Sequence, residues 1–539
     1  MAGKDMVWWQ SGVIYQIYPR SFQDSNGDGV GDLMGIASRL DYLQWLGVRA
    51  VWLSPIYPSP MADFGYDISD YGDIHPLFGT MQDFDALLEG IHRRKMKLIL
   101  DLVPNHTSDK HPWFLESRSS RDNPKRDWYI WKDAREHGAV PNNWLAAFGG
   151  SAWEWDEATQ QYYYHAFLKE QPDLNWRNTE VQTAMLSMMR FWLEKGVDGF
   201  RVDVMWHMIK DALFRDNPVN PDYQSHMATY DQLLPIYSTD QPEVHDIVRQ
   251  MRSLLDEFPE RMMIGEIYLP VHKLMIYYGT DNKGAHLPFN FMLLTLAWDT
   301  KKITAAINEY ETSLPKGGWP NWVLGNHDQP RVVSRIGIEQ ARVAAVLLLT
   351  LRGTPTIYYG EELGMRDVAI PPDKMMDPQG LNMPEKNLSR DPARTPMQWD
   401  NSEYSGFSLA RPWLPVDRTA AQNNVRVQQS DPSSMLWLYR KLIRLREENP
   451  VLITGSYIPV YTDHQIIAYL RKEEGHPVFL IVLNLSHRPC YFKLENRSLY
   501  GTIVLSTTPA LEQTTVRDTI TLSGDEAVVI ALQDSENNR

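Results

Sequence analysis

The chain has 539 residues, of which 43% are hydrophobic and 22% charged, as is usual for a globular protein. This length allows one large domain and at least one smaller one. The formal net charge of −15 argues against a polyanionic partner such as nucleic acid.

The short apolar segments alternate with amphipathic ones over some 450 residues. Eight strands are predicted, at Val13–Tyr18, Ala50–Leu53, Lys97–Val103, Gly199–Val204, Met262–Ile267, Leu287–Phe291, Trp322–Leu324 and Thr354–Tyr359. Helices are predicted at Leu33–Leu46, Met81–Arg94, Glu180–Lys195, Val244–Phe258, Lys301–Thr312, Glu339–Leu351 and Met435–Glu448. This alternation indicates an α/β fold with a parallel sheet, and the length favours a closed (β/α)8 TIM barrel over a doubly wound sheet.

Two segments interrupt the alternation. Residues 105–178 are rich in Trp, Asn, Asp and Pro, which predicts a loop-rich insertion after the third strand. Residues 362–415 contain many prolines, and so long a loop in a compact domain is usually a wall or lid of an active site. We therefore predict a barrel from residues 1–104 and 179–455, an inserted subdomain at 105–178, and a C-terminal antiparallel β-sandwich at 456–539.

The cellular location is predicted from what the chain lacks. Cys490 is the only cysteine, so no intramolecular disulfide can form. Residues 1–10 are poor in apolar residues, unlike a signal peptide, and no run reaches the roughly 18 apolar residues of a membrane span. We expect a cytoplasmic protein without a membrane partner.

Polar residues gather where the predicted strands end, which is where (β/α)8 barrels place their functional side chains. They are Asp101, Asn105 and His106 after the third strand, Arg201 and Asp203 at the end of the fourth, Glu266 at the end of the fifth, and His327 and Asp328 after the seventh. Any one of them could be structural, but chance convergence of the whole set on one rim is a poor explanation.

Arg201 and Asp203 are two residues apart on a strand, so both side chains point to the same face. A neighbouring guanidinium lowers the pKa of a carboxyl group by roughly 1–3 units and keeps it ionised. An ionised acid is suited to attack carbon, although this pair alone could equally be structural.

Paired carboxylates that flank a bond are the groups that hydrolyse glycosides. Asp203 would be the nucleophile. Glu266 follows an apolar run, where desolvation would raise its pKa, so it would be the general acid. Asp328, with His327, would bind sugar hydroxyls and stabilise the positive charge at the anomeric carbon. A covalent glycosyl intermediate and net retention would follow.

Four separated motifs resemble those of the α-amylase family, glycoside hydrolase family 13, in its α-glucosidase and oligo-1,6-glucosidase branch. They are Asp101-Leu-Val-Pro-Asn-His106, Gly199-Phe-Arg-Val-Asp203, Gly265-Glu266 and Asn326-His-Asp328, and a fifth is Gln171-Pro-Asp-Leu-Asn-Trp176. The resemblance covers nearly the whole chain. It implies the same three roles for Asp203, Glu266 and Asp328.

The resemblance also implies a pocket that is closed around the terminal glucose of the substrate. Asp63 and Tyr66 resemble the residues that close such a pocket, with Tyr66 stacked on the ring and Asp63 binding hydroxyls together with Arg394. His106, Arg201 and His327 match sugar-binding positions. A pocket of this shape would favour exo cleavage of short α-glucosides.

The loop Asp24-Ser-Asn-Gly-Asp-Gly-Val-Gly-Asp32 has oxygen-bearing side chains at alternate positions, as loops that bind hard cations do. It is not an EF-hand, because Gly35 stands where that motif needs Glu. By resemblance to the metal loop of this family branch, Asp24, Asn26, Asp28, the Val30 carbonyl and Asp32 would bind a structural Ca²⁺, or Mg²⁺. A plain polar turn is the alternative.

The leading prediction is a retaining α-glucosidase that releases glucose from maltose- or isomaltose-type substrates and needs no organic cofactor. A glucosyl transferase or isomerase, of the sucrose isomerase or trehalose-forming kind, would share the same carboxylates. A catalytically inactive transporter-associated homologue is a remote alternative, because all three acids are present. Val204 resembles the residue of members that act on α-1,6 bonds, but the run that follows it departs from theirs. The sequence leaves linkage and oligomeric state, monomer or homo-oligomer, open.

Overall fold

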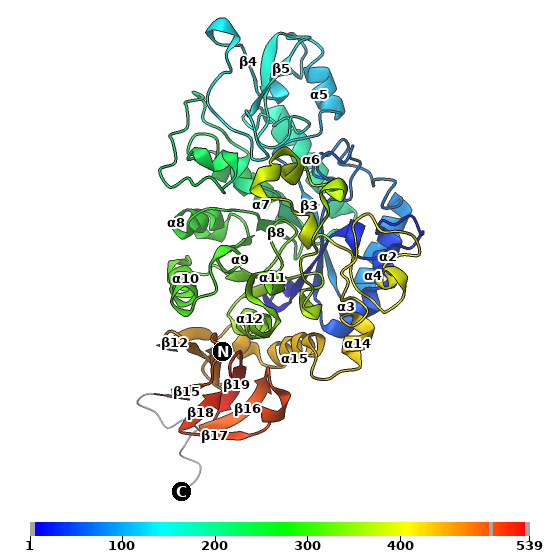
Figure 1. The fold of residues 1–539 in the computed structure, drawn as a ribbon. Helices are drawn as coiled ribbons and strands as arrows, with labels where there is room; N and C mark the ends of the chain where they lie inside the picture. The colour runs from blue at the N-terminus through cyan, green and yellow to red at the C-terminus, as the bar shows by residue number, and fades with distance from the viewer. Residues whose placement is uncertain (1–5, 495–499, 534–539) are drawn as a thin grey trace.

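The computed structural model describes residues 6–494 and 500–533. Eight parallel strands form a nearly closed barrel in the middle of the molecule (Figure 1). They are β1 (Ile14–Ile17), β2 (Ala50–Leu53), β3 (Lys97–Leu102), β7 (Gly199–Val202), β8 (Met262–Gly265), β9 (Leu287–Pro288), β10 (Asn321–Val323) and β11 (Thr354–Tyr358). The strand order is β10-β11-β1-β2-β3-β7-β8-β9. The predicted TIM barrel is confirmed.

Asn321 joins the two end strands of this sheet. Its side-chain Nδ2 donates to the Pro288 carbonyl at 2.6 Å, and its Oδ1 accepts from the backbone N–H of Asn290 at 2.9 Å. The side chain thus replaces ladder bonds between β9 and β10, for which no backbone pairing is found in the described residues. A buried amide with both ends satisfied can hold two strands together at this point.

Helices cover the outside of the barrel. The long ones are α4 (Met81–Arg93), α6 (Thr179–Glu194), α7 (Val244–Leu255), α10 (Thr300–Ser313), α12 (Ile338–Thr350) and α15 (Met435–Glu448). The remaining helices are short, and two of them lie outside this layer: α5 (Pro112–Ser117) in the inserted segment and α13 (Pro378–Asn382) in the proline-rich loop (Figure 1). The others are α1 (Trp8–Ser11), α2 (Leu33–Ser38), α3 (Leu40–Leu46), α8 (Val271–Leu274), α9 (Met292–Thr295), α11 (Val332–Ile336) and α14 (Val425–Gln429). None of the described helices is long and apolar enough to span a membrane.

The helix predicted at 33–46 is divided in two at Arg39. Arg39 leaves helical geometry, with φ −107° and ψ 6°. Its guanidinium donates to the Gln23 side chain at 2.7 Å and lies 4.2 Å from the centre of the Trp399 ring. These contacts come from distant parts of the chain, so the helical pattern of this segment could not reveal the break.

The inserted segment forms a small subdomain beyond the barrel, at the top of Figure 1. It has an antiparallel sheet of β4 (Trp131–Lys132), β5 (Trp153–Asp156) and β6 (Gln161–Tyr164), in the order β4-β6-β5. The prediction of a loop-rich segment did not include this sheet. Its strands are only two to four residues long and rich in Trp and Tyr on both faces, so they lack the alternation that marks longer strands.

The C-terminal part is one antiparallel sheet of eight strands at the bottom of Figure 1. Its strands are β12 (Ser456–Thr462), β13 (Ile466–Lys472), β14 (Phe479–Asn484), β15 (Cys490–Lys493), β16 (Tyr500–Ser506), β17 (Thr515–Arg517), β18 (Thr519–Leu522) and β19 (Ala527–Leu532). Side chains from β13, β14, β15, β18 and β19 share one buried cluster, so the sheet folds over itself like a sandwich.

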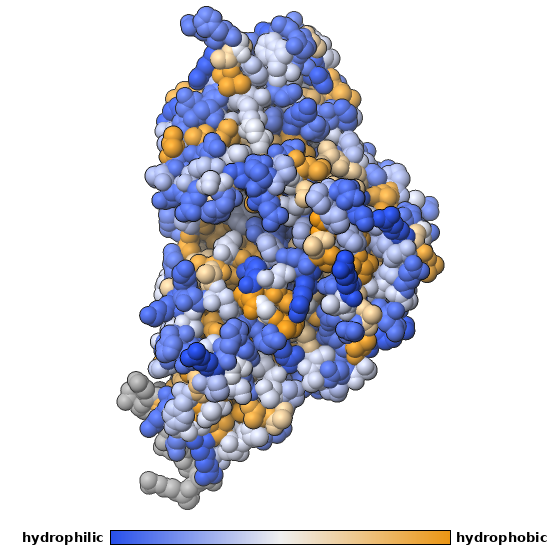
Figure 2. All heavy atoms as spheres, in the orientation of Figure 1, coloured by the Kyte–Doolittle hydropathy of each residue, from blue (hydrophilic) through white to orange (hydrophobic). Residues whose placement is uncertain are grey.

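The surface in the orientation of Figure 1 is mostly polar, with smaller apolar areas between (Figure 2). The face is hollowed between the inserted subdomain and the barrel (Figure 2). Residues that follow β3, β7, β8 and β10 line one cavity at the carboxyl ends of the barrel strands.

Candidate active site

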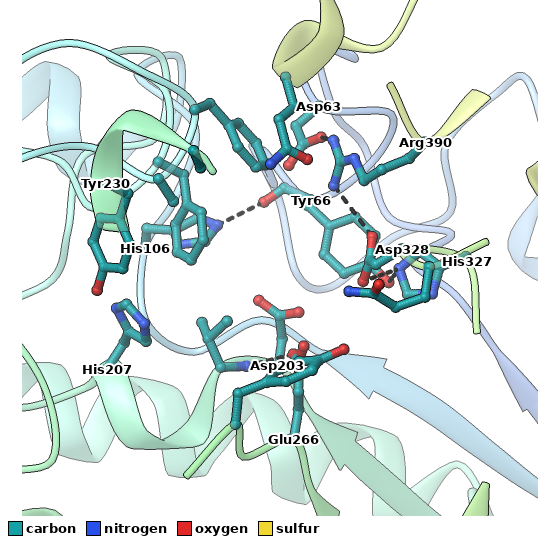
Figure 3. A pocket seen from close by; sticks show the side chains of 18 of the residues that line it. Asp63, Tyr66, His106, Asp203, His207, Tyr230, Glu266, His327, Asp328 and Arg390 are labelled. Carbon is teal, nitrogen blue, oxygen red and sulfur yellow. Dashed lines mark hydrogen bonds and ion pairs between the residues drawn. The ribbon is translucent and has the colours of Figure 1, made fainter. Parts of the chain in front are cut away.

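A cavity of about 350 Å³ lies at the carboxyl ends of the barrel strands (Figure 3). This volume is typical of a small-ligand site. It is lined by Asp63, Tyr66, His106, Ala147, Phe148, Phe167, Asp203, Val204, Trp206, His207, Ala228, Tyr230, Asp231, Glu266, Tyr268, His327, Asp328, Gln329, Gln379 and Arg390. The structure therefore brings Asp203, Glu266 and Asp328 together in the wall of one cavity, as expected for residues at the carboxyl ends of barrel strands.

The register of two barrel strands places Asp203 beside Glu266. Val202 of β7 pairs with Gly265 of β8, so the next residue of each strand leaves the sheet at the same height. Arg201 then contacts both acids, with Nη1 2.7 Å from Asp203 Oδ1 and Nη2 2.6 Å from Glu266 Oε2. One guanidinium thus fixes two carboxyl groups at neighbouring positions in the cavity wall.

The same guanidinium has a third partner, and this changes the expected protonation of Asp203. Arg201 Nη1 is also 2.8 Å from Asp101 Oδ1. Burial and the nearby Glu266 raise the pKa of Asp203 well above its ordinary value, against the opposing effect of Arg201. Arg201 lowers the pKa of Asp203 as predicted, but the predicted net result, a pKa below the ordinary value, is wrong, because burial and Glu266 outweigh one cation that is shared among three buried acids.

Burial also raises the pKa of Glu266, while Arg201 lowers it. Two carboxyl groups on one guanidinium titrate as a coupled pair, so the pKa of the first ionisation belongs to the pair and not to either residue alone. A pair that holds one proton contains one ionised and one protonated carboxyl group. That is the charge state which a nucleophile and a general acid need together.

Val204, directly after Asp203, has an unusual backbone conformation. Its φ of 34° and ψ of 47° lie in the left-handed region, which β-branched residues rarely adopt. In this conformation its backbone N–H donates to Glu266 Oε2 at 2.9 Å. The strained residue therefore gives Glu266 a second donor and fixes which way its carboxyl group points.

Asp328 is surrounded by cationic and polar groups. Its carboxylate is 3.2 Å from Arg390 Nη1, 2.9 Å from Arg394 Nη2 and 3.3 Å from His327 Nε2. Burial alone would raise its pKa, but His327 and the two arginines lower it further than burial raises it. Asp328 is therefore ionised over the whole working range of a protein.

Asp63 pairs with Arg390, whose Nη2 is 2.7 Å from Asp63 Oδ1. The sequence expectation was that Asp63 and Arg394 together bind the hydroxyls of the sugar. Arg394 is only 1% exposed, does not line the cavity, and donates to the His327 carbonyl at 2.8 Å behind Asp328. The structure gives the place beside Asp63 to Arg390. The two arginines, which flank a turn at residues 391–393, both contact Asp328 Oδ1.

Tyr66 and His327 form a stacked pair with ring centres 5.4 Å apart and planes at 4°. The Tyr66 hydroxyl lies 2.7 Å from His327 Nε2 and 3.1 Å from Asp101 Oδ2. His106 lies across the cavity, where its Nδ1 accepts from the Asn105 side-chain amide and its Nε2 donates to the Tyr66 carbonyl, each at 3.1 Å. Three predicted sugar-binding residues thus lie in the wall, each held by hydrogen bonds, while Arg201 stands behind it.

Several wall residues were not identified from the sequence, namely Ala147, Phe148, Phe167, Trp206, His207, Ala228, Tyr230, Asp231, Tyr268, Gln329, Gln379 and Arg390. Arg390 lies in the same run as Arg394, and Trp206 and His207 follow the nucleophile candidate by three and four residues. Proximity to these motifs was the available signal. The others come from loops, where no periodic pattern indicates which residue faces a cavity.

The loop at residues 24–32 is a tight turn held by its own side chains. Asp24 accepts from the backbone N–H groups of Asn26, Gly27 and Gly29, and Asp32 accepts from Ser25 and Gly35. Within the described ranges, no three His, Cys, Asp or Glu side chains are grouped so that they could hold a metal ion. The oxygens of this loop fit a cation only in part, because backbone donors already occupy the two buried aspartates.

A (β/α)8 barrel with a carboxylate pair on one guanidinium is the architecture of a glycoside-hydrolysing enzyme. A family model described as the α-amylase catalytic domain matches residues 16–455. This match spans most of the chain, and the chain belongs to the α-amylase family.

Relatives of known name agree with this family. The oligo-1,6-glucosidase of Parageobacillus thermoglucosidasius is 41% identical, with 92% of this chain and 94% of that protein covered. Maltase A1 of Drosophila melanogaster is 42% identical, with 89% and 87% covered. Among solved structures, an α-glucosyl transfer enzyme has a TM-score of 0.92 at 39% identity, covering 98% of this chain and 100% of that one. The isomaltulose synthase of Protaminobacter rubrum has a TM-score of 0.90 at 34% identity, covering 98% and 100%.

Proposed function

We propose that this protein is a retaining, exo-acting α-glucosidase that releases glucose from the non-reducing end of short α-glucosides. The observation that carries the proposal is the contact of Arg201 with both Asp203 and Glu266 in a cavity closed by the Asp63–Arg390 pair. Carboxyl groups held by one guanidinium stand close together, as retention requires. An inverting enzyme needs room for a water molecule between them.

The reaction would proceed in two steps. Asp203 attacks the anomeric carbon and forms an ester bond to it, while Glu266 gives its proton to the departing glycosidic oxygen. Glu266, now a carboxylate, then takes a proton from water, whose oxygen displaces Asp203 and regenerates both acids. Asp328, which stays ionised, stabilises the positive charge that develops on the sugar ring.

The ends of the cavity support exo action. Arg390 contacts Asp63 and Asp328, and it joins the wall to the loop that follows β11. A bridge of this kind blocks the extension of a glucose chain beyond the first sugar. The hydroxyl groups of a terminal glucose would form hydrogen bonds with Asp63, Arg390 and Asp328.

The name of one relative, oligo-1,6-glucosidase, together with Val204 supports α-1,6 bonds as good substrates. We propose that isomaltose is cleaved at least as readily as maltose. Hydrolysis of maltose with isomaltose left untouched would contradict this part of the proposal.

Turnover of sucrose, maltose and isomaltose by the wild type and by Asp203→Ala tests the main proposal. We expect free glucose as the product, with the α-anomer appearing first in an NMR time course, and a loss of activity of about 10⁴-fold or more in the variant. Asp222→Ala, at an exposed position on a nearby loop, is the matched control. Near-normal activity of Asp203→Ala would refute the mechanism.

A glucosyl transferase or isomerase is the second candidate, favoured by the similarity to an α-glucosyl transfer enzyme and an isomaltulose synthase. The same experiment separates the two. Isomerised disaccharide or longer oligosaccharide in place of free glucose would favour transfer over hydrolysis.

We also propose that the loop at 24–32 binds a structural Ca²⁺, or Mg²⁺, through Asp24, Asn26, Asp28, Val30 and Asp32. The oxygens at alternate positions support this, although hydrogen bonds within the loop compete for them. Adding Ca²⁺ after chelation should raise the melting temperature of the wild type and not that of Asp28→Ala. A melting temperature that is insensitive to chelator and Ca²⁺ would remove the metal from the proposal.

A further inference from the structure

Two residues at the closed end of the cavity come from one short loop. Asp63 and Tyr66 both line the cavity (Figure 3), and both lie between β2 and α4. The backbone N–H of Tyr66 donates to the Asp63 carbonyl at 3.1 Å, so the two side chains stand at the ends of a single tight turn. A group that fixes this turn therefore fixes two of the side chains that would meet the first glucose.

The backbone of this loop is strained. The central residues of the turn, Phe64 and Gly65, have φ values of 49° and 108°, and Met61, just before the turn, has a φ of 66°. Glycine adopts such angles readily, but a residue with a side chain as large as that of Phe64 rarely does. Strain of this kind persists only where the surrounding structure holds the backbone in place, and it is often found at binding sites.

Asp67 supplies hydrogen bonds that hold the loop. Its Oδ1 accepts from the backbone N–H of Asp63 at 3.0 Å and from the Ser59 hydroxyl at 2.9 Å. Its Oδ2 accepts from the backbone N–H of Ala62 at 2.9 Å. Asp67 is fully buried and does not line the cavity, so its carboxylate contacts the loop and not a ligand.

The charge of Asp67 suits these three donors. Burial raises the pKa of Asp67 to about 6, while the N–H groups of Asp63 and Ala62 and the Ser59 hydroxyl lower it. At neutral pH the group is therefore mostly an ionised carboxylate, which only accepts hydrogen bonds. Hydrogen bonds to an ionised acceptor are about twice as strong as those between neutral groups, so this carboxylate can offset the strain at Phe64.

Packing holds the outer side of the loop. The Arg20 guanidinium lies 5.0 Å from the centre of the Phe64 ring and 4.8 Å from that of Trp413, and the two rings are 5.3 Å apart. Arg20 belongs to the short turn after β1 and Trp413 to the proline-rich segment, so three separate parts of the chain meet at Phe64. This packing fixes the ring of the strained residue, while Asp67 fixes the backbone of Asp63.

Building on the proposed function, we infer that Asp67 is a positioning residue for the first glucose, because it fixes the turn that presents Asp63 to Arg390 and to a sugar hydroxyl. The Asp63 carboxylate lies 2.7 Å from Arg390 Nη2, and this contact requires the backbone of Asp63 to stay in one place. Without the Asp67 carboxylate, the strained turn relaxes and moves Asp63 away from the closed end. Asp67 touches no substrate atom and acts through Asp63.

The test is a double-mutant cycle on kcat/KM for 4-nitrophenyl α-glucoside. Asp67→Asn keeps the size of the side chain but replaces one acceptor with a donor, and we expect it to lower kcat/KM by about 10- to 100-fold. Asp63→Ala should lower kcat/KM by more than about 100-fold. If Asp67 acts through Asp63, adding Asp67→Asn to Asp63→Ala should lower kcat/KM by less than about 3-fold further.

The separate kinetic constants distinguish positioning from a loss of folded enzyme. A variant that merely contains less folded protein has a lower apparent kcat and an unchanged KM. We expect Asp67→Asn to raise KM as well, because a displaced Asp63 binds glucose less well. Asp70→Asn, at an exposed position on the same segment, is the matched control and should leave both constants within about 2-fold of the wild type.

The outcomes separate this inference from the proposed function. Additive losses in the double variant, a loss in kcat alone, or near-normal kinetics of Asp67→Asn would overturn the role of Asp67 while leaving an α-glucosidase. Absence of wild-type activity on every α-glucoside would overturn the two together. If Asp67→Asn fails to fold, Ser59→Ala, which removes one donor to Asp67, takes its place in the cycle. Its smaller loss should again vanish in the Asp63→Ala background, and an additive loss or no loss would be equally contrary to the inference.

Discussion

Asp63 and Arg390 form a buried ion pair 2.7 Å long, although 327 positions separate them in the sequence. Arg390 also contacts Asp328 and Asp377, so one side chain connects the loop after β2, the loop after β10 and the proline-rich segment. The closed end of the cavity is therefore an electrostatic network. Its stability depends on every member being present.

Arg390→Ala should impair both substrate binding and folding stability. It leaves Asp63 and Asp377 buried without their main cation, and removal of one partner from a buried pair costs about 3–5 kcal/mol. We expect kcat/KM for maltose to fall by more than about 100-fold and the melting temperature to fall. Arg390→Lys should be intermediate, because lysine keeps the charge but lacks the forked guanidinium.

Arg366→Ala is the matched control for this prediction, since that arginine is exposed on the same proline-rich segment. It should change kcat/KM by less than about 2-fold. If Arg390→Ala bound substrate and melted like the wild type, the network would not close the pocket.

Lys210 connects the inserted subdomain to the loop after β7. Its Nζ is 2.5 Å from Asp173 Oδ2 and 2.7 Å from Asn105 Oδ1, and it is fully enclosed. Lys210→Met should destabilise the protein by about 3–5 kcal/mol, because Asp173 is left as an unpaired buried charge. Denaturant unfolding measures the loss, with Lys169→Met, an exposed position in the subdomain, as control.

The double variant Lys210→Met with Asp173→Asn provides the stricter test. It removes both charges, so it should be more stable than Lys210→Met alone. Additive losses in the double variant would show that the two residues are not coupled.

The acid limb of the pH profile of kcat/KM should report the ionisation of Asp203 in the free enzyme. Burial and Glu266 raise the pKa of Asp203, so this limb should lie above the range of an ordinary aspartate. Glu266→Gln removes the neighbouring negative charge and leaves Arg201 to Asp203 and Asp101, so the limb should move to lower pH.

The measurement uses α-glucosyl fluoride, whose leaving group depends little on protonation, so that Glu266→Gln still turns over. Asp222→Asn, on the surface, should leave the limb in place. A limb that stays or moves upward in Glu266→Gln would show that the two acids do not share their ionisation.

The barrel and its three acids could be predicted because both depend on local pattern. Short apolar strands alternate with helices, and an acid that directly follows a buried strand, such as Asp203 or Glu266, must emerge at the rim. The partner of Asp63 could not be predicted in this way. Arg390 and Arg394 lie four residues apart in a segment without regular structure, and only the path of that segment decides which one enters the cavity.

The prediction that Asp203 has a lowered pKa was wrong for a related reason. The sequence shows that Arg201 is two residues away, but it does not show that Asp101 and Glu266 share the same guanidinium. Charge interactions between residues that are distant in the sequence are the part of the site that local sequence patterns cannot predict.

Glu361, in the turn after β11, should make the protein less stable as pH rises. Its Oε1 accepts from the Tyr439 hydroxyl at 2.9 Å, its Oε2 has no partner in the described part of the chain, and burial raises its pKa to about 8. An unfolded glutamate has a pKa near 4.3. Between these two values the folded protein binds more protons than the unfolded chain, so the free energy of unfolding falls as pH increases.

Glu361→Gln keeps an acceptor for Tyr439 and removes the proton from the equilibrium. The melting temperature of the variant relative to the wild type should therefore increase between pH 5 and pH 8, by roughly 2–6 °C. Glu474→Gln, at an exposed position, should show no such trend. A difference in melting temperature that stays constant with pH would mean that Glu361 is already ionised in the fold, with its charge balanced by Arg335 and Arg331, which lower its pKa.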